Sequence, residues 1–262
     1  MSELATSSKS RFRHIGVIGG GAWGTALAAS ALKAGRDVRL WAREREVVDQ
    51  INSENENRDF LPGVALDLGL RATPDLAEAA KADALLLVCP AQYMRPTCQD
   101  LADHLKKDVP LVICAKGVEK GSLALMSEIV GEILPGHPLA VLSGPTFARE
   151  VAEGKPTAIT LACADHSLGE ALVGALGHDR FRPYLSGDVI GAQVGGAVKN
   201  VLAIATGIAE GQELGANASA ALITRGLAEI VRLGLALGAR QETMMGLSGL
   251  GDLVLTCSSP QS

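Results

Sequence analysis

Four glycines separate an apolar run from an alanine-rich run near the start of this chain, in the stretch VIGGGAWGTALAASALKAG. Gly19, Gly21 and Gly24 fit the spacing G-x-G-x-x-G directly after the apolar HIGVIG. In such a motif the first glycine permits a tight turn, the second lets the backbone approach a pyrophosphate, and the third lets helix and strand pack closely. Free amides and the helix dipole then face the phosphates. The motif predicts a strand, a dinucleotide-binding turn and a helix from Ala22 to Ala34, although glycines in turns also serve structure alone.

Short apolar segments alternate with helical patterns from Arg13 to about Ser186. The segments are HIGVIG, DVRLWA, LGLRAT, DALLLVCP, PLVICA, PLAVLSG, TAITLAC and FRPYLS. Strands separated by helices indicate βαβ units and a mostly parallel sheet. The continuous apolar run ALLLV suits a strand covered on both faces. The expected fold class is therefore an α/β Rossmann-type domain with a mostly parallel sheet.

Two apolar helical patterns follow Ser186. The first begins at the candidate cap Asp188 and runs to Gly211, and the second covers Ala216 to Ala239. The second has one broad apolar face, formed by Leu222, Ile223, Leu227, Ile230 and Val231. We therefore expect a flexible tail at residues 1–12, a dinucleotide-binding domain at 13–187 and an all-α domain at 188–262.

Charge and composition exclude several kinds of partner. Lys plus Arg number 24 and Asp plus Glu 29, giving a net charge of −5, and no long basic stripe offers a nucleic-acid footprint. No apolar run has the length of a membrane span, and the polar start lacks a secretory signal, so we expect a cytoplasmic protein. The five cysteines form no C-x-x-C pair and mostly lie in apolar runs, which indicates small buried residues and no metal site: Cys89, Cys98, Cys114, Cys163 and Cys257.

A dinucleotide domain followed by helices suggests hydride transfer, and transfer to a carbonyl needs a proton donor. Lys199 is a candidate because it lies mid-helix among apolar or small neighbours in GGAVKNVLAIA. Gly195 and Gly196, about one turn earlier, permit close approach of another backbone. Desolvation lowers the pKa of a lysine, which suits an acid working near neutral pH. The alternative is a lysine at the helix rim whose ammonium reaches solvent.

Three further segments carry candidate site residues. Lys116 follows PLVICA, at the carboxyl end of a predicted parallel strand where open α/β sheets bind ligands, or is an exposed loop lysine. The turn SGPTFAREVAEG has amides around Gly144 and Thr146, with Pro145 at a predicted first helical position, and either holds an anion or ends a strand. Asp252 is the one acid in GLSGLGDLVLT, where it pairs with a lysine or forms a turn.

The end of the second predicted strand bears on cofactor choice. An NAD-selective site usually has an Asp or Glu there, about 20 residues after the glycines. This chain instead has Trp41, Ala42 and Arg43 in VRLWARERE. Arg43 favours the 2′-phosphate of NADP(H), and Glu44 leaves NAD(H) as a second cofactor. The alternative is a solvated arginine at a strand end.

Together, these motifs resemble the bacterial NAD(P)-dependent glycerol-3-phosphate dehydrogenase family. The similarity covers nearly the whole chain, from GGGAWGTALA through AKGVE, SGPTFAREVA, GGAVKNVLAIATGIAEG and ALITRGLAEI to GLSGLGDLVLTC. It implies reversible reduction of dihydroxyacetone phosphate, a small phosphorylated substrate, to sn-glycerol 3-phosphate for phospholipid synthesis. It also implies a homodimer.

The resemblance assigns roles to individual residues. Lys199 matches the family's catalytic lysine, and Lys116 and Asp252 match its active-site partners. With the glycine motif, the positions near the cofactor are Gly19, Gly21, Ala22, Trp23, Gly24, Arg43, Lys116 and Ala148. The positions near the substrate are Lys116, Gly144, Thr146, Asn200, Asp252, Thr256 and Ser262.

The family pattern continues past Ser262 with an Arg-Asn pair that grips the substrate phosphate, as a bidentate arginine does. A polypeptide ending at Ser262 is therefore expected to bind cofactor and turn over poorly. Two rival interpretations stay open. One is a β-hydroxyacid or ketopantoate-type reductase, against which AKGVE and GLSGLGDLVLTC argue. The other is a non-catalytic dinucleotide-binding module, which would not need Lys116, Lys199 and Asp252.

Overall fold

The computed structural model describes residues 11–259, and eight strands in this part of the chain form one sheet. They are β1 (His14–Ile18), β2 (Asp37–Trp41), β3 (Arg71–Thr73), β4 (Ala84–Leu87), β5 (Leu111–Ile113), β6 (Leu139–Ser143), β7 (Thr157–Cys163) and β8 (Phe181–Ser186). Their order is β3-β2-β1-β4-β5-β6-β7-β8, and every neighbouring pair is parallel except β6 and β7. Each strand lies within a segment predicted from the sequence, so the mostly parallel sheet is confirmed.

The strand order reverses at β1. The chain moves from β1 outward to β2 and β3, and then returns to place β4 on the other side of β1. Ile15 accordingly lies opposite Val38 on one side and Ala84 on the other. In open α/β sheets, ligands bind outside the carboxyl ends of the strands at such a switch point. A ligand site is therefore expected at the carboxyl ends of β1 and β4.

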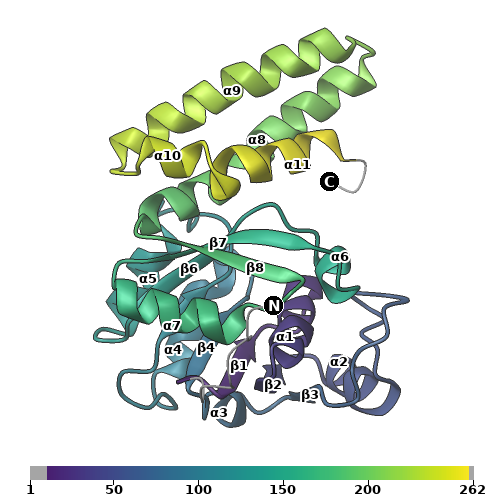
Figure 1. Cartoon of the computed structure of the whole chain (residues 1–262), viewed down its shortest axis with the longest axis vertical. Helices are drawn as coiled ribbons and strands as arrows, with labels where there is room; N and C mark the ends of the chain where they lie inside the picture. The colour runs from purple at the N-terminus through teal and green to yellow at the C-terminus, as the bar shows by residue number, and fades with distance from the viewer. Residues whose placement is uncertain (1–10, 260–262) are drawn as a thin grey trace, which may run out of the picture.

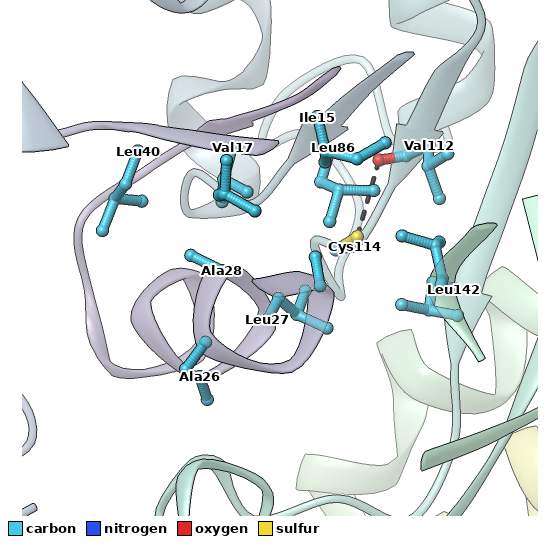
Figure 2. Packing of buried hydrophobic residues seen from close by; sticks show 14 of the residues in the cluster. Ile15, Val17, Ala26, Leu27, Ala28, Leu40, Leu86, Val112, Cys114 and Leu142 are labelled. Atoms are coloured by element: carbon cyan, nitrogen blue, oxygen red, sulfur yellow. Dashed lines mark hydrogen bonds between the residues drawn. The ribbon is translucent and has the colours of Figure 1, made fainter. Parts of the chain in front are cut away.

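Helices cover both faces of the sheet (Figure 1). They are α1 (Ala22–Lys33), α2 (Arg45–Asp49), η1 (Gln50–Glu54), α3 (Leu76–Ala79), η2 (Ala91–Tyr93), α4 (Met94–Leu101), α5 (Met126–Ile133), α6 (Ala148–Ala152) and α7 (His166–Leu176). Figure 2 shows Leu27 and Ala28 of α1 on the side of the helix that faces Val17 and Leu86 of the sheet. All four side chains are at most 2% exposed. The alanine-rich helix thus packs as closely as its small side chains allow, directly behind the glycine turn.

A helical layer follows the sheet, as the sequence predicted (Figure 1). It contains α8 (Val189–Gly211), α9 (Ala216–Ala236), α10 (Gln241–Met244), η3 (Leu247–Gly251) and α11 (Asp252–Ser258). Asp188 caps α8 as predicted, because its Oδ1 accepts a 2.8 Å hydrogen bond from the Gly191 amide. Its Oδ2 accepts a second bond from the Arg240 amide at 2.7 Å. This buried carboxylate therefore links the start of α8 to the segment between α9 and α10.

Helix α9 ends at Ala236, three residues before the predicted Ala239. Gly238 adopts a positive φ of 94°, and the Ala239 amide donates to the Gly234 carbonyl at 2.8 Å. This is the Schellman arrangement, in which a glycine in the left-handed region closes the helix. The helix was predicted too long because the helical spacing of apolar residues continues beyond the C-cap.

Helix α8 is long and apolar enough to cross a membrane by length and composition, and 39% of its most apolar window is buried. The core helix of a globular protein passes the same test. Helix α8 packs against β6, α9 and α11, and it carries a lysine paired with a buried carboxylate. The first half of α8 is therefore packed inside the protein, whereas Val201, Ile204 and Ile208 in its second half are exposed.

Candidate active site

A cavity of about 780 Å³ opens at the carboxyl ends of β1, β4 and β5. One wall is the glycine turn after β1, and another is the Val88–Pro90 segment after β4. Lys116 reaches the cavity from the loop after β5, and Lys199 and Asn200 reach it from α8. The cavity therefore lies at the switch point of the sheet and is bounded by the helical layer.

The glycine turn has the geometry that its sequence predicts. Gly19 has a φ of 131°, which favours glycine. A Cβ on Gly24 would lie 1.8 Å from the Gly19 carbonyl oxygen, so the helix can begin against the turn only with glycine there. A Cβ on Gly21 would meet nothing within 4 Å, because that backbone faces open space. Among the described residues no side chain caps α1, so no capping side chain competes with a ligand for the first backbone N–H groups of the helix.

Two lysines and one aspartate meet beside this cavity. Asp252 is fully buried, and its Oδ2 lies 2.5 Å from Lys116 Nζ while its Oδ1 lies 2.6 Å from Lys199 Nζ. A buried carboxylate is costly unless opposite charges and hydrogen bonds offset its desolvation, and both are provided here. The Lys199 side chain is only 13% exposed, so the alternative of a rim lysine reaching solvent is wrong. Asp252 likewise pairs with lysines, the first of its two predicted roles.

Thr256 fixes the direction of the Lys199 ammonium. Its Oγ1 donates to the Asp252 carbonyl at 2.7 Å and accepts from Lys199 Nζ at 2.8 Å. An ammonium has three N–H donors, of which Asp252 and Thr256 take two. The third donor is not taken by these two partners, and Lys199 lines the cavity.

Lys116 has a pKa lowered to about 8, because burial disfavours its charged form and Lys199 adds a like charge. The nearby Asp252 carboxylate opposes both effects. Lys116 Nζ also donates to the Gly144 carbonyl at 3.0 Å. The charge of this lysine is therefore sensitive to pH just above neutrality.

Two glycines of α8 allow this cluster to form. A Cβ on Gly195 would lie 2.2 Å from the Ser248 carbonyl oxygen, and one on Gly196 would lie 3.2 Å from Lys116 Cγ. The close backbone approach predicted for this pair is confirmed at Gly195, whereas the atoms nearest to Gly196 belong to the side chains of Ser143 and Lys116. The approach at Gly195 brings η3, and hence the start of α11 with Asp252, against the helix that carries Lys199.

The turn after β6 differs in one detail from the sequence prediction. Helix α6 begins at Ala148, with Phe147 as its N-cap, so the placement of Pro145 at the first helical position is wrong. Thr146 Oγ1 donates to the Gly144 carbonyl at 3.3 Å, and this local turn delays the helix. Thr146 and Ala148 line the cavity, while Gly144 lies behind it and accepts from Lys116.

Arg43 lies at the cavity wall after β2. Its guanidinium pairs with Glu44 at 2.9 Å and lies 5.7 Å from the centre of the Tyr93 ring. The Arg43 and Glu44 side chains are 67% and 44% exposed, and exposed ion pairs contribute little stability. Arg43 can therefore turn toward a bound anion at small cost.

All eight residues predicted to lie near a cofactor line this cavity, together with three predicted for substrate binding or catalysis. Those lining it are Gly19, Gly21, Ala22, Trp23, Gly24, Arg43, Lys116, Thr146, Ala148, Lys199 and Asn200. Gly144, Asp252 and Thr256 lie behind the lysines and hold them through hydrogen bonds. Ser262 and residues 1–10 lie outside the described residues.

The sequence interpretation missed Phe60 and Tyr93, two aromatic residues that line the cavity. Tyr93 follows β4 at the ligand-binding edge of the sheet, so its position after a predicted strand was a usable signal. Phe60 lies in the polar stretch between β2 and β3, which has no hydrophobic periodicity from which its position could be predicted. Only the folded chain brings it to the glycine turn.

Comparison with known proteins agrees with this architecture. The family model described as NAD-dependent glycerol-3-phosphate dehydrogenase N-terminus matches residues 14–169, and the corresponding C-terminus model matches residues 188–262. The chain is 67% identical over 250 residues to glycerol-3-phosphate dehydrogenase [NAD(P)+] of Rhodospirillum rubrum, covering 95% of this chain and 72% of that protein. It is 65% identical to the protein of the same name from Paramagnetospirillum magneticum, covering 95% and 91%.

Solved structures give the same result. The glycerol-3-phosphate dehydrogenase of Coxiella burnetii superposes with a TM-score of 0.92 at 42% identity, covering 96% of this chain and 78% of that one. The ketopantoate reductase of Ralstonia eutropha has a TM-score of 0.65 at 17% identity, covering 88% and 78%. That second likeness shows the fold alone.

Proposed function

The chain belongs to the NAD-dependent glycerol-3-phosphate dehydrogenase family, and from this premise we propose how its residues carry out the reaction. It is an oxidoreductase that interconverts dihydroxyacetone phosphate and sn-glycerol 3-phosphate with NAD(P)H. The observation that supports our assignment of the chemistry is the buried Asp252 carboxylate between Lys116 and Lys199, beside a cavity that begins at a glycine turn.

The residues present fit a dinucleotide. The turn at Gly19 and the open backbone at Gly21 suit a pyrophosphate at the start of α1, where the helix dipole favours anions. We propose that Gly19, Gly21, Ala22, Trp23 and Gly24 hold the diphosphate end, with Arg43 and Ala148 at the flanks. NAD(P)H, when bound, supplies the hydride.

Lys199 is the proton donor in this proposal. Its Nζ is held by Asp252 and Thr256, and because Lys199 lines the cavity we propose that its third donor meets the substrate oxygen. As the substrate oxygen gains negative charge, this ammonium stabilises it and gives up a proton. Asp252 keeps the ammonium charged and aimed, and Lys116 orients the substrate. Thr146 and Asn200, which line the same cavity, and Gly144, behind it, complete the proposed substrate site.

Cofactor preference is the finer part of the proposal. The family name allows both NAD and NADP, and we propose that Arg43 favours NADP(H). Its exposed side chain leaves Glu44 at little cost to meet a 2′-phosphate.

The reaction is tested by following NADPH absorbance with dihydroxyacetone phosphate, with ketopantoate and with no ketone. Oxidation of NADPH only with dihydroxyacetone phosphate is expected. Consumption only with ketopantoate would establish the reductase alternative, and binding of NADPH without consumption in either case would establish the non-catalytic module.

We also propose a dinucleotide domain at 13–187, a helical domain at 188–262, a cytoplasmic location and a role in phospholipid synthesis. A homodimer is supported by exposed apolar side chains on α8, namely Val201, Ile204 and Ile208. Light scattering of the purified protein at several concentrations tests the dimer, and a constant monomer mass would contradict it.

A further inference from the structure

The glycine turn is tied to the chain between β2 and β3 by a buried asparagine. Asn57 is 0% exposed, and its Nδ2 donates to the Gly20 carbonyl at 2.9 Å and to Thr25 Oγ1 at 2.8 Å. Thr25, also 0% exposed, adds a longer bond of 3.4 Å to the same carbonyl. We propose that Asn57 is a positioning residue that sets the orientation of the turn for binding a diphosphate.

Three consecutive glycines make such a tie necessary. Glycine loses more conformational freedom on ordering than any other residue, and peptide planes between glycines rotate at little steric cost. Gly19, Gly20 and Gly21 have no Cβ, so no side chain of the turn itself can hold those planes. A bond from outside the turn orders it before a ligand arrives, which reduces the ordering cost of binding.

The bond acts on one particular peptide plane. In a trans peptide the C=O and N–H groups point in opposite directions, and no cis peptide occurs in the described chain. Because the Gly20 carbonyl points toward buried Asn57, the Gly21 N–H points away from it. Gly20 and Gly21 both line the cavity, and Gly21 faces open space. Asn57 thus directs a backbone donor toward the position proposed for the diphosphate.

The orientation of the Asn57 amide is determined by its partners. The Gly20 carbonyl can only accept, and the Phe60 amide, which contacts Asn57 Oδ1 at 3.2 Å, can only donate. The same side chain therefore also positions Phe60, which lines the cavity. An aspartate would keep the shape but could not donate to Gly20.

This inference rests on the proposed dinucleotide function, so its test separates the two. Calorimetric titration is carried out with NADPH, ADP-ribose and adenosine 2′-monophosphate, of which only the last lacks a diphosphate. Asn57→Ala is expected to weaken NADPH and ADP-ribose binding about tenfold or more, with less than about a twofold change for adenosine 2′-monophosphate. In kinetic assays its KM for NADPH rises while kcat at saturating NADPH is retained.

Asn52→Ala is the matched control. Asn52 lies in the same segment and exchanges two hydrogen bonds of 2.9 Å with the Ala72 backbone, away from the glycine turn. Its affinities for all three ligands are expected to stay at the wild-type level. Thr25→Val keeps the side-chain shape and removes one hydrogen-bond partner of Asn57, and it replaces Asn57→Ala if that protein does not fold. Thr25→Val is expected to weaken ADP-ribose binding about threefold.

Unchanged ADP-ribose affinity in a folded Asn57→Ala or, in its place, Thr25→Val protein would overturn the inference. An equal loss for adenosine 2′-monophosphate, or an equal loss in Asn52→Ala, would also overturn it, because the effect would then be general. Wild-type protein that binds neither NADPH nor ADP-ribose would instead overturn the proposed function itself.

Discussion

Asp252 Oδ1 lies 2.6 Å from Lys199 Nζ although the two residues are 53 positions apart, and the carboxylate is fully buried. The second carboxylate oxygen lies 2.5 Å from Lys116 Nζ, 136 positions away. One acid therefore holds two ammonium groups, one from the loop after β5 and one from α8, at a single edge of the cavity.

Lys199→Met is expected to lower kcat by about 10³-fold, since general acid catalysis contributes about 10²–10⁴-fold. NADPH affinity, measured by fluorescence titration, should change far less, because the glycine turn is untouched. Lys155→Met is the control, since that lysine side chain is 54% exposed and, within residues 11–259, forms ion pairs with Glu150 and Glu153 at the surface. A Lys199→Met protein with a near-normal rate would contradict the assigned role.

Asp252→Asn is expected to lower the free energy of unfolding by about 3 kcal/mol and to abolish most activity. The change leaves two nearly buried ammonium groups without their shared anion, and breaking a buried ion pair is strongly destabilising. Urea denaturation measures the loss. Asp37→Asn, at an exposed pair with Arg13, should cost less than about 1 kcal/mol; equal effects of the two changes would count against the cluster.

The KM for dihydroxyacetone phosphate is expected to rise as the pH passes about 8, where Lys116 loses its proton. Between this pKa and the ordinary lysine value of 10.5, the unfolded chain holds a proton that the native protein has released. The contribution of Lys116 to stability therefore increases with pH across that window. Initial rates of ketone reduction from pH 7 to 9.5 give the KM for dihydroxyacetone phosphate at each pH. In a Lys116→Arg protein this KM should not rise near pH 8. A flat profile in the wild type would refute the expected rise.

Arg43→Ala is expected to weaken NADPH binding about tenfold and to leave NADH binding within about twofold, because only NADPH carries the 2′-phosphate. Parallel titrations with both cofactors measure the ratio. Arg45→Ala is a useful comparison, since Arg45 begins α2 and is not among the cavity residues. An unchanged NADPH preference in Arg43→Ala would rule out Arg43 as the selecting residue.

Gly195→Ala is expected to destabilise the protein by about 2 kcal/mol or more and to lower kcat, because a methyl group 2.2 Å from the Ser248 carbonyl oxygen must push η3 away from α8. Gly207→Ala on the same helix meets nothing within 4 Å and should stabilise by about 0.5–1 kcal/mol. Thermal unfolding of both proteins provides the comparison. Stabilisation by Gly195→Ala would show that the close approach is not required.

Local patterns in the sequence were sufficient to predict the strands and the long helices α1, α8 and α9. All eight strands were predicted from apolar runs, and α1 and α8 from the glycine motif and the Asp188 cap, because these features act within a few residues. Pro145 was misplaced because a side-chain hydrogen bond from Thr146 delays α6. Asn57 and Phe60 were missed because the polar segment that contains them has no hydrophobic periodicity.

The sequence by itself determined the order of strands and helices, the glycine turn and the identity of the lysines and the aspartate. Their meeting was decided by tertiary structure alone. Parallel strands bring their carboxyl ends to one edge, Gly195 of α8 lets η3 approach, and Gly196 leaves room for the Lys116 side chain, so that Asp252 reaches both ammonium groups. Such contacts depend on the packing of elements far apart in the chain. They therefore cannot be predicted from the spacing of residues along one element.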